Sequence, residues 1–62
     1  MQATFKGGDR ITVTIDDTDF EAVVEDPSAM YQGDHRLMRV YFPEHECTGL
    51  YSPRRCRPKS AD

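Results

Sequence analysis

The chain has 62 residues, of which 37% are hydrophobic and 31% are charged, and its formal net charge at pH 7 is −3. A chain of this length forms one domain and buries only about 60% of the surface that it exposes when unfolded. That size leaves no room for a cleft between two lobes, so we expect a protein that is not an enzyme, with no cofactor and no small-molecule substrate. The apolar residues are gathered in periodic runs, which predicts a folded core rather than disorder.

Compartment and redox state can be inferred from what the sequence lacks. No apolar stretch approaches the ~20 residues of a membrane span, and the start lacks the basic and apolar regions of a secretory signal. The two cysteines, Cys47 and Cys56, are fewer than a small disulfide-stapled fold carries. We therefore expect a cytoplasmic protein with two free thiols and no contact with a membrane. One disulfide remains open if the two Cα atoms lie within about 7 Å.

The first two predicted strands form a hairpin. Residues 9–16 alternate between polar and apolar side chains with a period of two, which is typical of a half-buried strand. The carboxylate-rich residues 16–19 predict a turn, because short Asp side chains bond to their own backbone and tolerate unusual dihedral angles. Residues 20–25 form the second strand, which we expect to end at Pro27 since proline has no N–H for a ladder.

A longer loop over residues 26–35 separates this hairpin from three further short strands. Residues 36–42 carry apolar side chains on both faces, which is typical of a central strand or one curled inside a barrel. Residues 47–52 form a fourth strand. A single tight turn at residues 53–55 leads to the last strand, residues 56–58.

These elements define one all-β domain over residues 9–58. We expect residues 1–8 to be a flexible lead-in, with Phe5 turned back onto the core, and residues 59–62 to be a frayed tail. Five short strands bury both faces best when they curl into a small barrel, which also hides the strand edges.

Four segments, in this order, resemble the Tudor-type branch of the SH3-like barrels. In that family a Gly-Asp start, an aromatic-x-Ala-x-Val strand and a one-turn helix before the last strand recur. The resemblance covers residues 7–58 and implies a five-stranded SH3-like barrel with a single 3-10 turn before the last strand. The segments that carry it are Gly8-Asp9-Arg10-Ile11, Phe20-Glu21-Ala22-Val23-Val24, Leu37-Met38-Arg39-Val40-Tyr41-Phe42 and Tyr51-Ser52-Pro53-Arg54-Arg55-Cys56-Arg57-Pro58.

The resemblance also implies a possible role for aromatic side chains. Tudor domains that read methylated side chains hold a cation against an aromatic cage, and Phe20 and Phe42 match two of its positions. The loop of residues 43–46 lacks the aromatic and Asn residues that the family carries there, so burial in the core explains both phenylalanines better. An aromatic groove for a protein partner stays open, and its residues would be Phe20, Tyr41, Phe42 and Tyr51.

Basic side chains are concentrated near the end of the chain. Residues 1–50 hold ten acidic and four basic side chains, a net charge of −6, whereas residues 51–62 hold one acidic and four basic ones, a net charge of +3. Arginine suits phosphate because its planar guanidinium donates hydrogen bonds in pairs. The predicted nucleic-acid site comprises Arg54, Arg55, Arg57 and Lys59, assisted by Arg36 and Arg39. The isoelectric point near 5.2 favours the alternative that these cations pair with the chain's own carboxylates.

Two other groups of side chains have weaker functional interpretations. The acidic hairpin of residues 16–21 lacks the glycine and terminal glutamate of a calcium loop, which leaves a solvated turn or a surface for a basic protein. Possible zinc ligands lack the usual Cys-x-x-Cys spacing, so we expect no metal site. They are His35, His45, Cys47 and Cys56.

The sequence thus predicts a small binding module with two possible partners. The first is nucleic acid at the arginine cluster, with binding that weakens steeply as salt rises. The alternative is a protein bound at the aromatic groove or at the acidic hairpin, and binding at the groove should survive moderate salt.

Overall fold

The computed structural model describes residues 5–59, which are all-β. The expectations for residues 1–4 and 60–62 lie outside the described residues. The described part contains no α-helix, and so none that could cross a membrane. Its elements are β1 (Arg10–Ile15), β2 (Thr18–Gln32), β3 (His35–Phe42), β4 (Cys47–Tyr51), the 3-10 helix η1 (Pro53–Arg55) and β5 (Cys56–Pro58).

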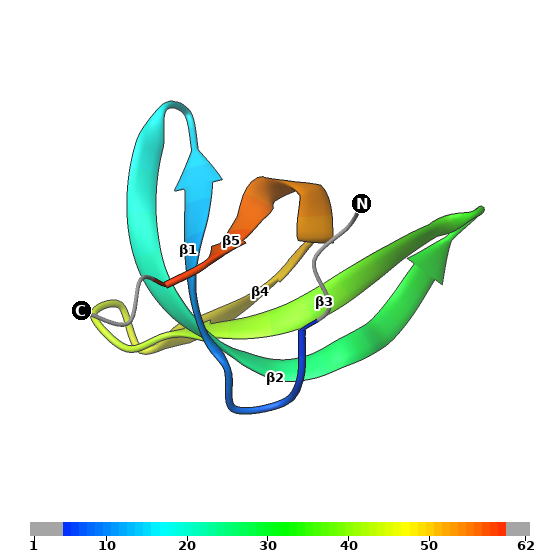
Figure 1. The fold of residues 1–62 in the computed structure, drawn as a ribbon, viewed down its shortest axis with the longest axis horizontal. Coiled ribbons are helices and arrows are strands. Elements are labelled where there is room, and N and C mark those ends of the chain that lie inside the picture. The colour runs from blue at the N-terminus through cyan, green and yellow to red at the C-terminus, as the bar shows by residue number, and fades with distance from the viewer. Residues whose placement is uncertain (1–4, 60–62) are drawn as a thin grey trace.

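The five strands form one antiparallel sheet in the order β4-β3-β2-β1-β5, strongly curved along β2 (Figure 1). The expected closure into a barrel is not confirmed for the described residues, in which the sheet is not closed and has β4 and β5 as its edges. All three residues of β5 pair with β1, and β4 pairs with β3. The helix η1 therefore connects the two edges without a ladder between them.

The turn predicted over residues 16–19 is present but is confined to two residues, because β2 already begins at Thr18. Ile15 pairs with Thr18, and the intervening Asp16 and Asp17 have φ angles of 50° and 64°. Positive φ at both central residues gives a turn whose twist matches the flanking strands, and aspartate tolerates it better than most residues.

The second strand continues well beyond the predicted end at Pro27. It runs for 15 residues to Gln32, with shifts in its pairing with β3 between Val24 and Asp26 and again between Asp26 and Met30. Proline can be accommodated in such an irregular stretch because no ladder bond is required there. The predicted loop over residues 26–35 is therefore mostly strand, and only residues 33–34 form a turn.

The extra length of β2 builds a two-stranded projection, here called the arm (residues 30–37). Its pairs are Met30 with Leu37, Tyr31 with Arg36, and Gln32 with His35. Neither β1 nor β4 pairs along this stretch, so the arm extends from the rest of the sheet (Figure 1). Met30 and Tyr31 are accordingly 50% and 65% exposed.

The core lies on the concave face of the curved sheet, where the alternating apolar residues of the central strands meet. Phe5 is buried there, as expected, and part of the lead-in is held by hydrogen bonds: the N–H of Gly8 donates to the carbonyl of Val24 at 2.7 Å. Lys59, expected in the frayed tail, donates its N–H to the carbonyl of Arg10 at 3.1 Å. The buried set is Phe5, Ile11, Val13, Ala22, Val24, Met38, Val40, Phe42 and Cys56.

Two methionines offer a matched test of this core. Met38 is fully buried, whereas Met30 on the arm is half exposed. We expect Met38→Ala to lower the free energy of unfolding by about 2–5 kcal/mol, because it removes buried contacts and leaves a cavity. Met30→Ala should change it by about 0.5 kcal/mol or less. Urea unfolding followed by circular dichroism measures both, and equal losses would contradict the described core.

Candidate functional site

Three of the six basic residues predicted to bind nucleic acid are held in ion pairs with the chain's own carboxylates. Arg57 Nη2 lies 2.8 Å from Asp19 Oδ2, and Lys59 Nζ lies 2.6 Å from Glu21 Oε1. Strand order brings both pairs together, since β1 lies between β2 and β5. The β1 residues that pair with Asp19 and Glu21 are the short Thr14 and Thr12. The third pair joins Arg39 Nε to Glu25 Oε1 at 3.3 Å.

The pKa values of the two carboxylates paired with Arg57 and Lys59 are lowered. A hydrogen bond from the Thr14 hydroxyl lowers the pKa of Asp19, and the hydrogen bond and positive charge of Arg57 lower it further. The hydrogen bond and charge of Lys59 lower the pKa of Glu21. Pairs that are this exposed contribute little to stability, but they direct the cations toward the protein's own surface.

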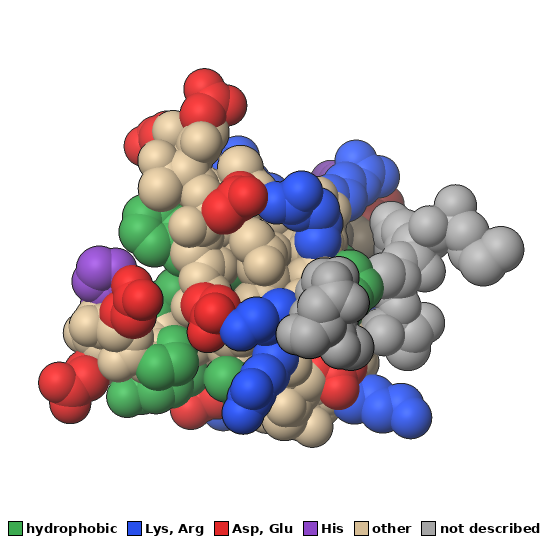
Figure 2. Space-filling view, turned by 60° about the vertical axis from the view of Figure 1, so that its left-hand side comes forward, with side chains coloured by type: hydrophobic (Ala, Val, Ile, Leu, Met, Phe, Trp, Pro, Cys, Tyr) green, Lys and Arg blue, Asp and Glu red, His purple; other side chains and the backbone are tan. Residues whose placement is uncertain are grey.

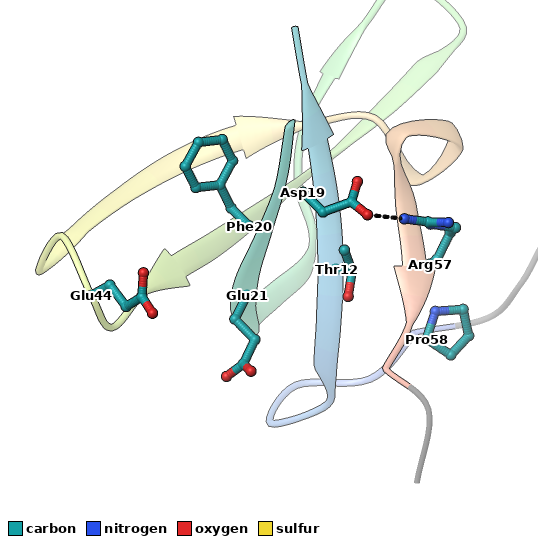
Figure 3. A pocket seen from close by; sticks show the side chains of 7 residues that line it. All are labelled: Thr12, Asp19, Phe20, Glu21, Glu44, Arg57 and Pro58. Atoms are coloured by element: carbon teal, nitrogen blue, oxygen red, sulfur yellow. Dashed lines mark hydrogen bonds and ion pairs between the residues drawn. The ribbon is translucent and has the colours of Figure 1, made fainter. Parts of the chain in front are cut away.

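The Asp19–Arg57 pair and Glu21 line a depression of about 490 Å³ on the outer face of the sheet. Figure 3 shows the Asp19–Arg57 contact across β1, with Thr12 between the strands and Glu21 and Glu44 farther along the depression. Asp19 and Glu21 of the acidic hairpin already pair with Arg57 and Lys59. The hairpin is therefore only partly available to a basic partner. In the view of Figure 2, acidic and basic side chains lie next to one another near the middle of the surface.

Two of the other predicted cations converge on a second depression, beside the arm. Arg36 of the arm and Arg54 of η1 line one depression of about 420 Å³, although 17 positions separate them in the sequence. No ion pair within residues 5–59 involves either of them or Arg55. The remaining lining residues are Tyr31, Asp34, His35, Ser52 and Pro53. We call this depression the arm site.

Local backbone geometry fixes both arginines. Pairing across the arm sets Tyr31 opposite Arg36, so these side chains share one face of the ribbon. Ser52 caps η1, since its hydroxyl accepts the N–H of Arg54 at 3.3 Å. Because Tyr51 pairs with Met38, η1 begins beside the base of the arm. The sequence did not predict that Tyr31 lies opposite Arg36, because residues 26–35 read as a loop.

Three of the four predicted groove aromatics meet at the other end of β3. The ring centroids of Phe20 and Phe42 lie 6.3 Å apart with an interplanar angle of 85°. Those of Phe42 and Tyr51 lie 5.7 Å apart with an interplanar angle of 87°. They line a largely apolar depression of about 240 Å³, here called the aromatic hollow. Tyr41 is not part of it, because side chains alternate along β3 and Phe42 takes the inner face.

The aromatic residues that line the hollow differ in how deeply they are buried. Phe42 is 5% exposed and belongs to the core, as the burial interpretation predicted, whereas Phe20 and Tyr51 are only partly buried. The sequence missed His45, whose ring lies 5.7 Å from that of Phe20. It sits in the β3–β4 turn, where alternation gives no signal. The other residues that line the hollow are Ile15 and Cys47.

The cysteines and histidines do not form a common cluster. Cys47 is exposed and Cys56 is buried, and both are free thiols. Burial raises the pKa of Cys56 to about 11, which makes it an unreactive thiol at neutral pH. His35 lines the arm site and His45 lines the aromatic hollow. Residues 5–59 contain no group of three side chains of the kind that could hold a metal ion.

Comparison with models of protein families, with curated proteins and with solved structures finds no match to this chain.

The ion pairs predict how stability responds to acid. Folded-state pKa values of Asp19 and Glu21 lie below their ordinary values of 3.8 and 4.5. Both groups therefore stabilise the fold above those values, and this contribution disappears as the pH falls through the lower folded values. We expect the Asp19→Asn/Glu21→Gln variant to lose less stability than the wild type between neutral and strongly acidic pH. Thermal unfolding over this range measures the difference, and parallel pH profiles would contradict it.

Proposed function

We propose that this chain is a non-enzymatic binding module of the SH3-like, Tudor-type class that binds single-stranded nucleic acid at the arm site. The strand order β4-β3-β2-β1-β5, with a 3-10 helix between β4 and β5, supports the class, together with the sequence resemblance. The barrel of this type would be partly open, with β4 and β5 as free edges.

The convergence of Arg36 and Arg54 on one depression carries the functional proposal. Neither guanidinium group has a carboxylate partner within residues 5–59, and each can donate paired hydrogen bonds to phosphate oxygens. Tyr31 is 65% exposed beside them and offers a ring on which a base can stack. A base in a duplex is already stacked, so this combination favours a single strand.

The size and charge of the site set the expected affinity. Asp34 lies in the same depression, and the whole chain carries a net charge of −3. Both oppose a polyanion at long range. Binding should therefore be weak at physiological salt and should strengthen steeply as salt is lowered.

Arginines with and without an ion pair among residues 5–59 provide the test. We expect Arg36→Ala/Arg54→Ala to weaken binding of a short single-stranded DNA at low salt and to reduce the slope of log affinity against log salt by about 0.7 for each lost contact. Arg57→Ala should leave affinity nearly unchanged, because Arg57 is paired with Asp19. Fluorescence anisotropy of labelled DNA over a salt series measures both quantities.

Two outcomes would reject this function. Absence of binding at low salt would exclude nucleic acid as the partner. Equal losses in the double variant and in Arg57→Ala would show that the DNA responds to net charge and not to the arm site.

A second candidate function is recognition of a basic protein segment at the aromatic hollow. Its apolar lining of Phe20, Phe42 and Tyr51 supports this alternative. Carboxylates flank the lining residues in sequence, with Asp16 after Ile15 and both Glu44 and Glu46 around His45. Aromatic faces attract cations, and the adjacent negative charge would add to that attraction.

The two exposed histidines separate the two candidates. We expect His45→Ala to weaken binding of a lysine-rich peptide by several-fold and to leave DNA binding unchanged, because His45 lines only the hollow. His35→Ala should do the reverse, since His35 lines the arm site. Amide NMR titrations of both variants with both probes measure the effects. If neither variant changes peptide binding, the hollow is not a protein-binding site.

A further inference from the structure

The two edges of the open sheet differ in how well they are protected. Strand β5 is three residues long and contains Arg57 and Pro58, a charged side chain and a residue without an N–H. Both features discourage pairing with another strand. Strand β4 has five residues, Cys-Thr-Gly-Leu-Tyr, with no charge and no proline. In a chain that is 31% charged, it is the one described strand that carries no acidic or basic side chain.

The outer edge of β4 is accessible. Its ladder is with β3, and within residues 5–59 no other strand pairs with it. Cys47 and Thr48 are exposed, and Leu50 is 42% exposed. Unpaired backbone groups along an uncharged strand are a template for an added strand.

The inner face of β4 is already covered by its own chain. A Cβ atom added to Gly49 would lie 2.6 Å from the ring of Tyr51, so that ring lies directly over the middle of the strand. A partner therefore has access to the backbone edge and to the outward row of Thr48 and Leu50, rather than to the inner face. Gly49, in the middle of β4, has no side chain that could contact a partner strand.

Charge at the two ends of β4 identifies the occupant. The turn that precedes β4 contains Glu44 and Glu46, and η1 after it contains Arg54 and Arg55. The strand thus has an acidic end and a basic end. An antiparallel second copy brings the acidic end of each chain beside the basic end of the other, whereas a parallel copy would bring like charges together.

We propose that a second copy of this chain pairs with it antiparallel along β4, around a two-fold axis at Gly49. The two Gly49 residues then face each other without side chains to collide. Thr48 of each copy lies opposite Leu50 of the other, and Glu44 lies at the level of Arg54 of the other copy. The five-stranded sheets join into one, with isologous contacts, as closed dimers have. This pairing rests on the β4 edge and does not require the proposed nucleic-acid function. The two proposals share one residue, because Arg54 also lines the arm site.

A charge-swap pair of variants tests both the edge and its register. Thr48→Lys/Leu50→Lys sets lysine opposite lysine across the seam, and Thr48→Glu/Leu50→Lys sets glutamate opposite lysine. We expect the weight-average mass of the wild type to rise with concentration from 7.1 kDa toward twice that value. The Lys/Lys variant should stay at the monomer mass, and the Glu/Lys variant should rise at least as far as the wild type. Sedimentation equilibrium from ~10 µM to ~1 mM covers the range in which a small edge contact associates.

Three results would overturn the proposal. One is a wild-type mass that stays at that of the monomer throughout this range. Another is a folded Lys/Lys variant that associates as well as the wild type, which would locate the contact elsewhere. If either variant unfolds, amide NMR shifts of the wild type over the same concentration range test the contact. Shifts outside residues 44–55 without any in β4 would also overturn the proposal.

Discussion

The structure depends on β2 pairing with two neighbours at once. Its first part pairs with β1 through residues 18–23, and its later part pairs with β3 from Val23 to Gln32. A strand shared in this way must twist and bend, and the register shifts around Asp26 permit the bend. The curvature encloses the core on one face and leaves the far half of β2 free to build the arm. Both candidate sites lie at the ends of this bent strand.

Charge on the outer face is largely compensated by the chain itself. Because β1 lies between β2 and β5, the outward carboxylates of β2 reach across its threonines to Arg57 and Lys59. These cations belong to the C-terminal cluster that the sequence presents as one basic segment. The fold divides that segment, since η1 turns Arg54 toward the arm while β5 turns Arg57 toward Asp19. A basic run in sequence is therefore not a basic patch on this surface.

The arm site and the aromatic hollow differ in their side chains and therefore suit different kinds of partner. The arm site joins an exposed tyrosine to two guanidinium groups that have no ion pair in the described part of the chain, which suits a phosphate backbone with an unstacked base. The aromatic hollow joins partly buried rings to a turn rich in carboxylates, which suits a cationic segment. Between them runs β4, whose uncharged edge suits a second copy of the chain. The arm site and the aromatic hollow share no lining residue. The proposed β4 pairing involves Arg54 of the arm site and the strand that carries Cys47 and Tyr51 of the hollow, so only the Thr48 and Leu50 variants test it by itself.

The sequence by itself determined the all-β class, five strands, the hairpin turn at Asp16–Asp17 and most of the core, because period-two alternation and turn chemistry are local properties. It placed the end of β2 wrongly, since Pro27 breaks an ideal ladder but is tolerated where the register shifts. Only the tertiary structure decided that Arg36 meets Arg54, that His45 faces Phe20 and that Tyr41 lies apart. Those relations arise because strands that are distant in sequence pair with one another, and the local spacing of residues does not predict which strands pair.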